Sequence, residues 1–309
     1  MKKVLILLST YNGQKYLREQ LDSLYAQADV AVFILARDDG SKDDTIKILE
    51  EYQKRYGRMS ILAHSNIGCA KSFYTLIDYA STRMSHYDYY AFCDQDDVWQ
   101  TKKLSKAVEK LDEHESSNKL YFSTANYVDA NLNFIKKTNA PQYFDYKTCV
   151  FRNPVLGCTM VFDYAFLKII NTDFTKRIST QGKLQLHDAW AYKCANYLNT
   201  TIVNDENAYI NYRQHGGNVT VAEKSLVSKY KNALTGYYHN KNAHLSNCKM
   251  LLETFGSDIS EEKKKFLECL CDYDKNCFNT IKFLFVQPWR GESAIDRVLW
   301  ILVVLFRLY

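Results

Sequence analysis

The 309-residue sequence has little excess charge of either sign, with a formal net charge of +5. It also has no concentrated basic stripe interleaved with aromatic residues, and together these absences argue against a nucleic-acid partner. Internal repeats and low-complexity tracts are missing as well. With 47% apolar residues the chain can bury a sizeable core, so we expect one large domain or one domain with an appendage.

Two familiar nucleotide-binding motifs and paired metal-binding cysteines are also missing. The sequence contains no GxGxxG and no GxxxxGK[ST], which excludes a dinucleotide fingerprint and a P-loop. Its nine cysteines are an odd number without a paired CxxC motif or a histidine at ligand spacing. We therefore expect buried or free thiols and not a zinc site.

Long apolar runs are scarce at both ends. The N-terminal run "VLILL" is shorter than the ~7–15 residues of a signal peptide core, which together with the cysteines predicts a cytoplasmic, reducing location. The C-terminal run Val298–Phe306 has nine apolar residues, whereas a spanning helix needs about 20. It lies either in a membrane interface, with Trp300 and Tyr309 as anchors, or on the protein's own core.

What the first 115 residues do have is a regular alternation. Four apolar runs indicate strands: "KVLILLS", "VAVFILA", "MSILAH" and "YDYYAFC". Each is followed by apolar residues at helical spacing, beginning with Leu17, Leu21 and Leu24. This alternation predicts βαβ units, and thus an α/β fold with a mostly parallel, Rossmann-like central sheet flanked by helices.

Beyond residue 115 the pattern is looser. "GCTMVF" (157–162) reads as a strand, "LHDAWAYKCANYL" as a helix beginning near His187, and "NAYINYRQHGGN" as a strand entering a glycine-containing loop. From about residue 221 the chain reads as helices. We therefore predict a domain over 1–220 and a C-terminal helical region over 221–309, which serves membrane association or dimerisation.

Polar loops follow the four predicted parallel strands. In chain order they are "STYNG", "RDDGSKDD", "HSNIGCAKS" and "DQDDVW". Because such sheets bind ligands at the carboxyl ends of their strands, we expect these loops to form one site.

The last of these loops holds three acids, Asp94, Asp96 and Asp97. Buried carboxylates are costly without compensation, and hard oxygen ligands select Mg²⁺ or Mn²⁺, commonly together with substrate phosphates. The cluster therefore suits a metal that neutralises a diphosphate; the alternative is a solvated acidic turn.

Six motifs resemble those of family 2 glycosyltransferases of the GT-A fold, in the family's order and over residues 4–220. They are "STYNG", "RDDGSKDDT", "NIGCAKSF", "CDQDDVW", "LHDAW" and "YRQHGGNVT". The form "DQDDVW" with a later "HD" and "RQH" is most similar to the bacterial rhamnosyltransferase-like branch.

The resemblance implies a nucleotide-sugar site made of Thr10, Tyr11, Asp38, Asp39, Lys71, Asp94, Gln95, Trp99 and Arg213. In it, Asp39 or Asp38 would accept a hydrogen bond from the pyrimidine base. Asp94 would lie near the ribose, and Asp96 with His215 would bind Mg²⁺ or Mn²⁺. The alternatives are that the acids cap a helix, that Lys71 is solvated, and that Trp99 belongs to the core.

The resemblance also assigns the reacting groups. Asp188 would be the base that takes the proton of the acceptor hydroxyl, or else it only caps its helix. His187 departs from the acid more common in the family, and it would lie on the acceptor side with Gly157 and Cys158. Arg213 would pair with phosphate oxygens.

The implied activity is inverting transfer of L-rhamnose from dTDP-β-L-rhamnose to a lipid-linked saccharide at the cytoplasmic membrane face. A UDP-hexose or UDP-N-acetylhexosamine donor is the alternative within this class. A metal-dependent phosphohydrolase and a non-catalytic nucleotide-sugar-binding protein are the alternatives outside it.

Overall fold

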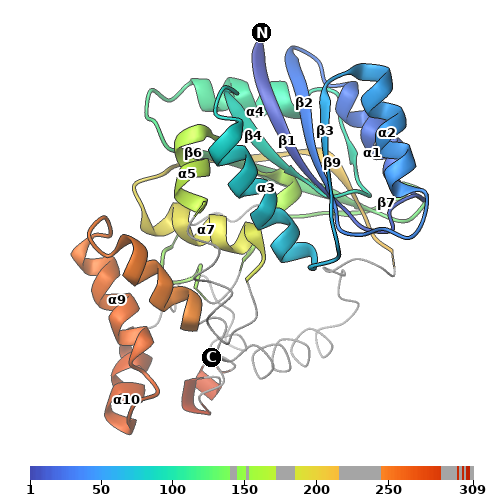
Figure 1. Cartoon of the computed structure of the whole chain (residues 1–309). Coiled ribbons are helices and arrows are strands. Elements are labelled where there is room, and N and C mark those ends of the chain that lie inside the picture. Colours follow the sequence, from blue (N-terminus) through green and yellow to red (C-terminus); the bar gives the residue numbers. More distant parts are fainter. Residues whose placement is uncertain are drawn as a thin grey trace.

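The computed structural model describes residues 1–139, 145–150, 153–171, 185–215 and 245–286, with 298, 301–302 and 304–306 near the C-terminus. A nine-stranded sheet forms the centre of the molecule (Figure 1). Its strand order is β3-β2-β1-β4-β8-β6-β9-β5, with β7 paired to β6.

The N-terminal half of the sheet is parallel. It consists of β1 (Lys2–Thr10), β2 (Val30–Asp38), β3 (Met59–Ala63) and β4 (Tyr89–Cys93). Residues Val4–Leu8 are completely buried, as expected for a strand covered on both faces. The sequence analysis predicted these four strands, and the structure confirms them.

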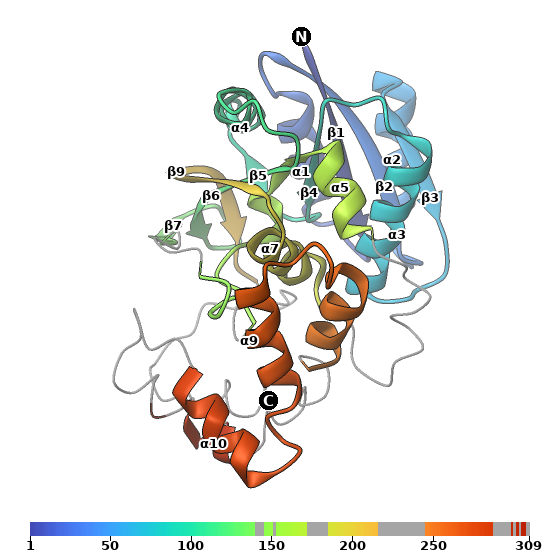
Figure 2. The same cartoon turned by 90° about the vertical axis from the view of Figure 1, so that its left-hand side faces the viewer.

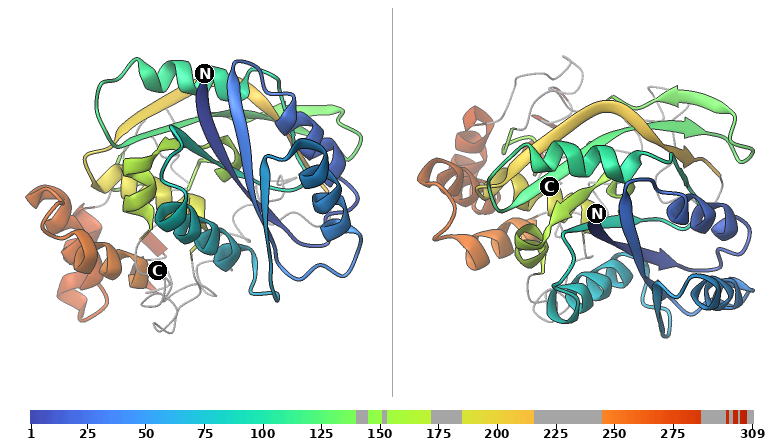
Figure 3. Two further views of the ribbon diagram at one scale, coloured as in Figure 1. Left: turned by 45° about the horizontal axis from the view of Figure 1, so that its top comes forward. Right: turned by 90° about the horizontal axis from the view of Figure 1, so that it is seen from above.

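The other half is mixed. β8 (Val161–Asp163) runs antiparallel to both β4 and β6 (Lys119–Val128), whereas β9 (Thr201–Arg213) runs parallel to β6. β5 (Val98–Trp99) and β7 (Phe134–Lys137) add antiparallel pairs. Figure 3 shows β9 as a long curved strand. The fold is therefore an α/β sheet that is parallel on one side and mixed on the other.

Helices cover the sheet on both faces. α1 (Leu17–Tyr25), α2 (Thr45–Tyr56) and α4 (Lys103–Asp112) bury their apolar residues in one core. α3 (Cys69–Arg83), α5 (Tyr164–Ile170) and α7 (His187–Tyr197) bury theirs in the other. The predicted helix near His187 is thus confirmed, and it lies below α5 in Figure 1.

The described C-terminal helices join this second core. They are a helical segment over 245–255, α9 (Glu261–Cys271) and α10 (Cys277–Val286), with α9 next to α7 in Figure 2. Phe266 packs on Tyr146, and Lys263 Nζ donates to Asn196 O at 2.7 Å. In the described part of the chain, no helix is both long and apolar enough to cross a lipid bilayer.

The predicted strand over 157–162 is partly wrong. Gly157–Thr159 forms a 3₁₀ turn, and only the following residues pair as β8. The reason is the close contact of Gly157 with the start of α7: a Cβ at residue 157 would lie 2.7 Å from His187 Nε2. A glycine is required there to let the turn approach that helix.

Candidate active site

A cleft of about 400 Å³ lies at the carboxyl ends of β1, β2 and β4. It brings together many of the predicted site residues: Thr10, Tyr11, Asp39, Asp94, Gln95, Asp96, Gly157, His187 and Asp188. The strand ends meet because β1 and β2 pair in register up to Thr10 and Asp38, and β1 pairs β4 up to Cys93. The expected gathering of the strand-end loops is therefore present.

Thr10 and Asp38 fix the turn after β2. Asp38 Oδ1 accepts from Thr10 Oγ1 at 3.0 Å, and its Oδ2 accepts from the backbone N–H groups of Gly40 and Ser41 at 3.1 and 2.8 Å. Asp38 is not among the described residues that line the cleft. Its carboxylate organises the loop, so of the two candidate base-binding acids only Asp39 faces the cleft.

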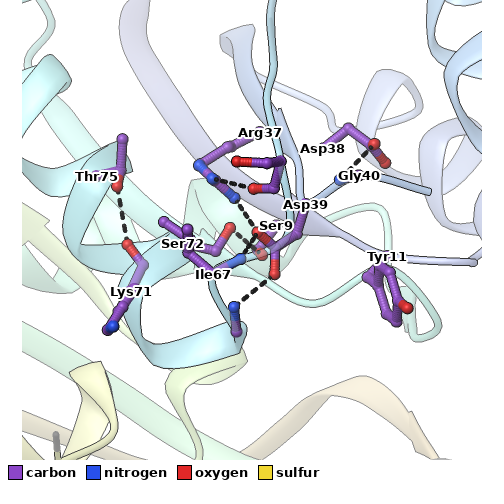
Figure 4. Close-up of polar contacts among 12 residues, drawn as sticks. Ser9, Tyr11, Arg37, Asp38, Asp39, Gly40, Ile67, Lys71, Ser72 and Thr75 are labelled. Carbon is purple, nitrogen blue, oxygen red and sulfur yellow. Dashed lines mark hydrogen bonds and ion pairs between the residues drawn. The ribbon is translucent and has the colours of Figure 1, made fainter.

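Asp39 is held on three sides (Figure 4). Its Oδ1 accepts from Arg37 Nη1 at 2.6 Å and from Ile67 N at 2.8 Å, and its Oδ2 accepts from Gly68 N at 2.8 Å. Arg37 and Asp39 are both buried, so each compensates the charge of the other. This pair presents a fixed carboxylate edge to the cleft, where a base N–H could donate to it.

Tyr11 and Gln95 join the first loop to the acidic loop. Tyr11 N donates to Gln95 Oε1 at 2.8 Å, and Gln95 Nε2 donates to Tyr11 O at 3.0 Å. Gly13 leaves room for this amide, since a Cβ there would lie 2.2 Å from Oε1. The Gln95 side chain therefore connects two loops, and Tyr11, a residue that is 46% exposed, lines the cleft.

The three acids of the loop lie in different surroundings. Asp94 and Asp96 line the cleft, whereas Asp97 is fully buried and accepts from Arg213 N at 3.0 Å. Burial, with the charges of Asp96 and Asp188, raises the pKa of Asp94 to about 7. Burial also raises the pKa of Asp97 well above its usual range, with the neighbouring acids adding to the effect.

Trp99 is a core residue. The prediction that it belongs to the nucleotide-sugar site is not confirmed, because it is absent from the described lining of the cleft. It is 3% exposed, lies in β5 and packs in the core beneath the cleft. The ammonium of Lys103, itself 1% exposed, lies 3.5 Å from the centroid of its ring. Burial lowers the pKa of Lys103 to about 8, while Asp97 nearby favours its charged form. Trp99 thus shields a buried cation under the acidic loop.

Within the described part of the chain, two groups of side chains could hold a divalent cation. Asp96 Oδ2 lies 2.8 Å from His215 Nε2, and both side chains are partly exposed. Asp94, Asp97 and Cys158 have ligand atoms within 4.8 Å of one another. However, burial raises the pKa of the Cys158 thiol well above its usual range, and a protonated thiol is a poor ligand for Mg²⁺. The oxygen and imidazole ligands of Asp96 and His215 therefore fit Mg²⁺ or Mn²⁺ better.

Arg213 differs from its predicted role as a phosphate ligand. Its Nε donates to Asp96 O at 2.8 Å, its Nη1 donates to Ala130 O at 2.6 Å, and its Nη2 pairs with Glu19. The side chain is buried and stacks over Tyr16. Its guanidinium therefore holds the backbone of the acidic loop in place and is not among the described cleft-lining groups.

Lys71 is also absent from the described lining of the cleft. It is half-buried in the first turn of α3, where its backbone oxygen accepts from Thr75 Oγ1 at 2.9 Å (Figure 4). A contact between Lys71 and phosphate stays a prediction.

Asp188 lies in the first turn of α7 and lines the same cleft as the acidic loop. Its Oδ1 accepts from Ala189 N at 2.7 Å. Burial raises the pKa of Asp188 to about 6, and hydrogen bonds from backbone N–H groups, led by Ala189, work against this rise. The carboxylate is therefore a base that is ionised at neutral pH, as proton abstraction requires.

Several site residues were not identified from the sequence. Phe73, Leu156, Leu186 and Tyr212 give the cleft apolar walls. Arg37 supports Asp39 from within β2. The signal for it was present, because a basic residue in an otherwise apolar strand, directly before two acids, needs a buried partner.

The family model for glycosyl transferase family 2 matches residues 5–177, which include the acidic loop. The chain belongs to this family. A dTDP-rhamnosyl transferase from Shigella flexneri, RfbG, is 32% identical over 227 residues, which cover 72% of this chain and 77% of the relative. An Escherichia coli glucosyltransferase named for UDP-Glc, WfgD, is 29% identical over 178 residues, or 56% of this glycosyltransferase and 65% of that protein.

Solved structures, one of them of a mannosyltransferase, share the fold. The Staphylococcus aureus TarS fragment 1–349 in complex with UDP has a TM-score of 0.56 at 18% identity, covering 100% of this chain and 80% of that one. The Pyrobaculum calidifontis mannosyltransferase PcManGT with GDP-Man and Mn²⁺ has a TM-score of 0.51 at 14% identity, with 99% and 80% coverage. The GT-A fold predicted from the motifs is thereby confirmed.

Proposed function

We propose that this glycosyltransferase is an inverting, metal-dependent rhamnosyltransferase. It transfers L-rhamnose from dTDP-β-L-rhamnose to a lipid-linked saccharide during synthesis of a bacterial cell-wall or capsule polysaccharide. The observation that carries the proposal is the cleft that holds Asp188 together with Asp39, Asp94 and Asp96. The similarity to a dTDP-rhamnosyl transferase supports the choice of donor.

In the proposed mechanism, each residue has a separate role in one nucleophilic displacement at the anomeric carbon. The acceptor hydroxyl gives its proton to Asp188 while its oxygen attacks the anomeric carbon. The bond from that carbon to the diphosphate oxygen breaks, and the nucleoside diphosphate leaves with the electron pair. Asp39 accepts from the pyrimidine, and Asp94 lies near the ribose. A cation held by Asp96 and His215 would stabilise the charge of the leaving diphosphate.

A second donor class follows from the same geometry. A carboxylate that accepts from a pyrimidine N–H selects uracil as well as thymine. One relative is named for UDP-Glc, and one TarS structure contains UDP-GlcNAc. Transfer from a UDP-hexose or UDP-N-acetylhexosamine is therefore the alternative within the proposal. A phosphohydrolase or a non-catalytic binding protein would explain the acidic loop but not a base at Asp188.

A donor panel tests the function. Purified protein is offered dTDP-β-L-rhamnose, UDP-Glc and UDP-GlcNAc with a lipid-linked saccharide analogue, and product mass is measured with and without Mn²⁺ or Mg²⁺. We expect metal-dependent product from dTDP-rhamnose at a rate at least about tenfold above the UDP-sugars, a difference of about 1.4 kcal/mol in transition-state stabilisation. If only a UDP-sugar gives product, the donor is that UDP-sugar and not dTDP-rhamnose. Phosphate release without acceptor would indicate a hydrolase.

Because the proposed acceptor is linked to a lipid, we also propose that the protein binds the inner face of the cell membrane. α10 exposes Phe278, Ile281 and Phe285 on one helical face, and Phe306 is 69% exposed near the C-terminus. Trp300 and Tyr309 lie outside the described residues. In a density-gradient flotation assay, we expect the protein to rise with anionic lipid vesicles. A Phe278→Ser/Phe285→Ser variant should remain in the dense fraction at the bottom of the gradient. Equal flotation of the wild type and the variant would contradict membrane binding by these side chains. A homodimer contact would then be the alternative role for them.

A further inference from the structure

The ring of His187 lies at the inner wall of the cleft, next to Asp188. It is 5% exposed and stacks on Phe73, with 3.6 Å between ring centroids and 18° between planes. The edge of a second ring, Phe92, meets it at a centroid distance of 4.5 Å and 80°. Two aromatic contacts at right angles therefore fix the plane of the imidazole and the direction of its two nitrogens.

Neither nitrogen of this ring has a hydrogen-bond partner within the described residues. A buried polar atom without a partner costs about 1–3 kcal/mol, so each such atom in a native structure needs an explanation. Other described side chains also have buried atoms without a hydrogen-bond partner, among them Lys103 and Lys193. Of that described group, only His187 also lines the cleft.

Gly157 packs closely against this ring. A Cβ at residue 157 would lie 2.7 Å from His187 Nε2 and 3.1 Å from the Cβ of Asp188. Gly157 has no positive φ, so its backbone conformation does not by itself demand glycine. The missing side chain therefore serves the close approach of this turn to His187 and Asp188, two residues that line the same cleft.

The ring also stays neutral. Burial lowers the pKa of His187 to about 3, so the imidazole carries one N–H donor and one acceptor nitrogen at neutral pH. A hydroxyl group, which both donates and accepts, complements such a ring without adding charge beside Asp188. An acid at this position would only accept when ionised.

We propose that His187 recognises one sugar hydroxyl at the reaction centre through a ring nitrogen. The inference rests on the proposed glycosyl transfer and adds a specificity-determining residue to it. The hydroxyl belongs to a pyranose ring, either that of the donor or that of the acceptor. Because the contact lies next to Asp188, it aligns the sugar for attack as well as selecting it.

The test combines three variants with deoxy substrates. His187→Leu removes both nitrogens, His187→Gln keeps one donor and one acceptor, and His86→Leu is the matched control at an exposed histidine that contacts Tyr87. kcat/KM is measured with the parent donor and acceptor, and with analogues that lack one hydroxyl each.

We expect His187→Leu to lower kcat/KM by about 10- to 100-fold with the parent substrates, His187→Gln by less, and His86→Leu not at all. The deoxy analogue that lacks the hydroxyl recognised by His187 cannot make this contact. The wild type and His187→Leu should therefore have equal kcat/KM with it. A donor analogue with this behaviour places the hydroxyl on the donor, and an acceptor analogue places it on the acceptor.

A uniform loss in His187→Leu across all analogues, with active wild type, would overturn recognition by His187 and leave the transferase activity standing. An inactive wild type with every donor would contradict the proposed function itself. Thermal unfolding shows whether His187→Leu is folded. If it is not, His187→Phe takes its place, because a phenyl ring can keep the contacts with Phe73 and Phe92 but has neither nitrogen.

Discussion

Replacing Asp188 with asparagine should lower sugar transfer by about 100- to 10,000-fold while the affinity for the donor stays near the wild-type value. The range is that of a positioned general base. Asparagine has the same shape, and its Oδ1 can still accept from Ala189 N, which the carboxylate does at 2.7 Å. Donor calorimetry and product formation are measured on the same preparation.

The pH dependence gives the same assignment a second readout. Burial raises the pKa of Asp188 to about 6. A base works only when ionised, so wild-type transfer should fall about tenfold per pH unit below this pH. Asp94, whose pKa burial raises to about 7, titrates in the same cleft, so a change in rate near pH 7 belongs to Asp94. Asp258→Asn, at an exposed acid, is the control and should keep the wild-type profile. An Asp188→Asn protein with wild-type turnover and the same profile would remove Asp188 as the base.

Replacing Asp96 with alanine should remove the stimulation by Mn²⁺ or Mg²⁺ and lower kcat/KM by about 100- to 10,000-fold, because a metal stabilises the leaving diphosphate by several kcal/mol. The fold should survive. The part of Asp96 that Arg213 contacts is its backbone oxygen, which alanine keeps, and the carboxylate is partly exposed beside His215. Metal affinity is measured by calorimetry, and unfolding by circular dichroism.

Glu109→Ala is a suitable control for this experiment. Glu109 is an exposed acid on α4 that pairs with Lys106, and its loss should leave metal affinity and turnover unchanged. A folded Asp96→Ala protein that binds and responds to the metal like the wild type would contradict the ligand assignment. The cluster of Asp94, Asp97 and Cys158 would then be the site to examine.

The sequence predicts the parallel half of the fold well because three of its strands, β1, β2 and β4, are largely buried. Each reads as a continuous apolar run, as Val4–Leu8 and Tyr89–Cys93 do. The mixed half is harder. β7 is exposed along its length and β5 has only two residues, so neither leaves a periodic signal. The 3₁₀ turn at Gly157 depends on a contact with α7, which is distant in the sequence.

For the site, the motifs predict which residues gather but not where each side chain points. Asp39 and Asp188 line the cleft as the motifs imply. Arg213 comes from an equally specific motif, yet its guanidinium faces Glu19 and two backbone oxygens. The direction of such a side chain depends on charges supplied by other elements, and spacing along the chain carries no information about them.

The central claim is that Asp188 and the acidic loop perform a single inverting displacement on a nucleotide-linked sugar. The most direct measurement is the anomeric configuration of the product that the wild type forms from dTDP-β-L-rhamnose and the lipid-linked acceptor analogue, determined by NMR. We predict an α-L-rhamnoside, formed only with Mn²⁺ or Mg²⁺. A β-L-rhamnoside, or equal product in EDTA, would contradict the account.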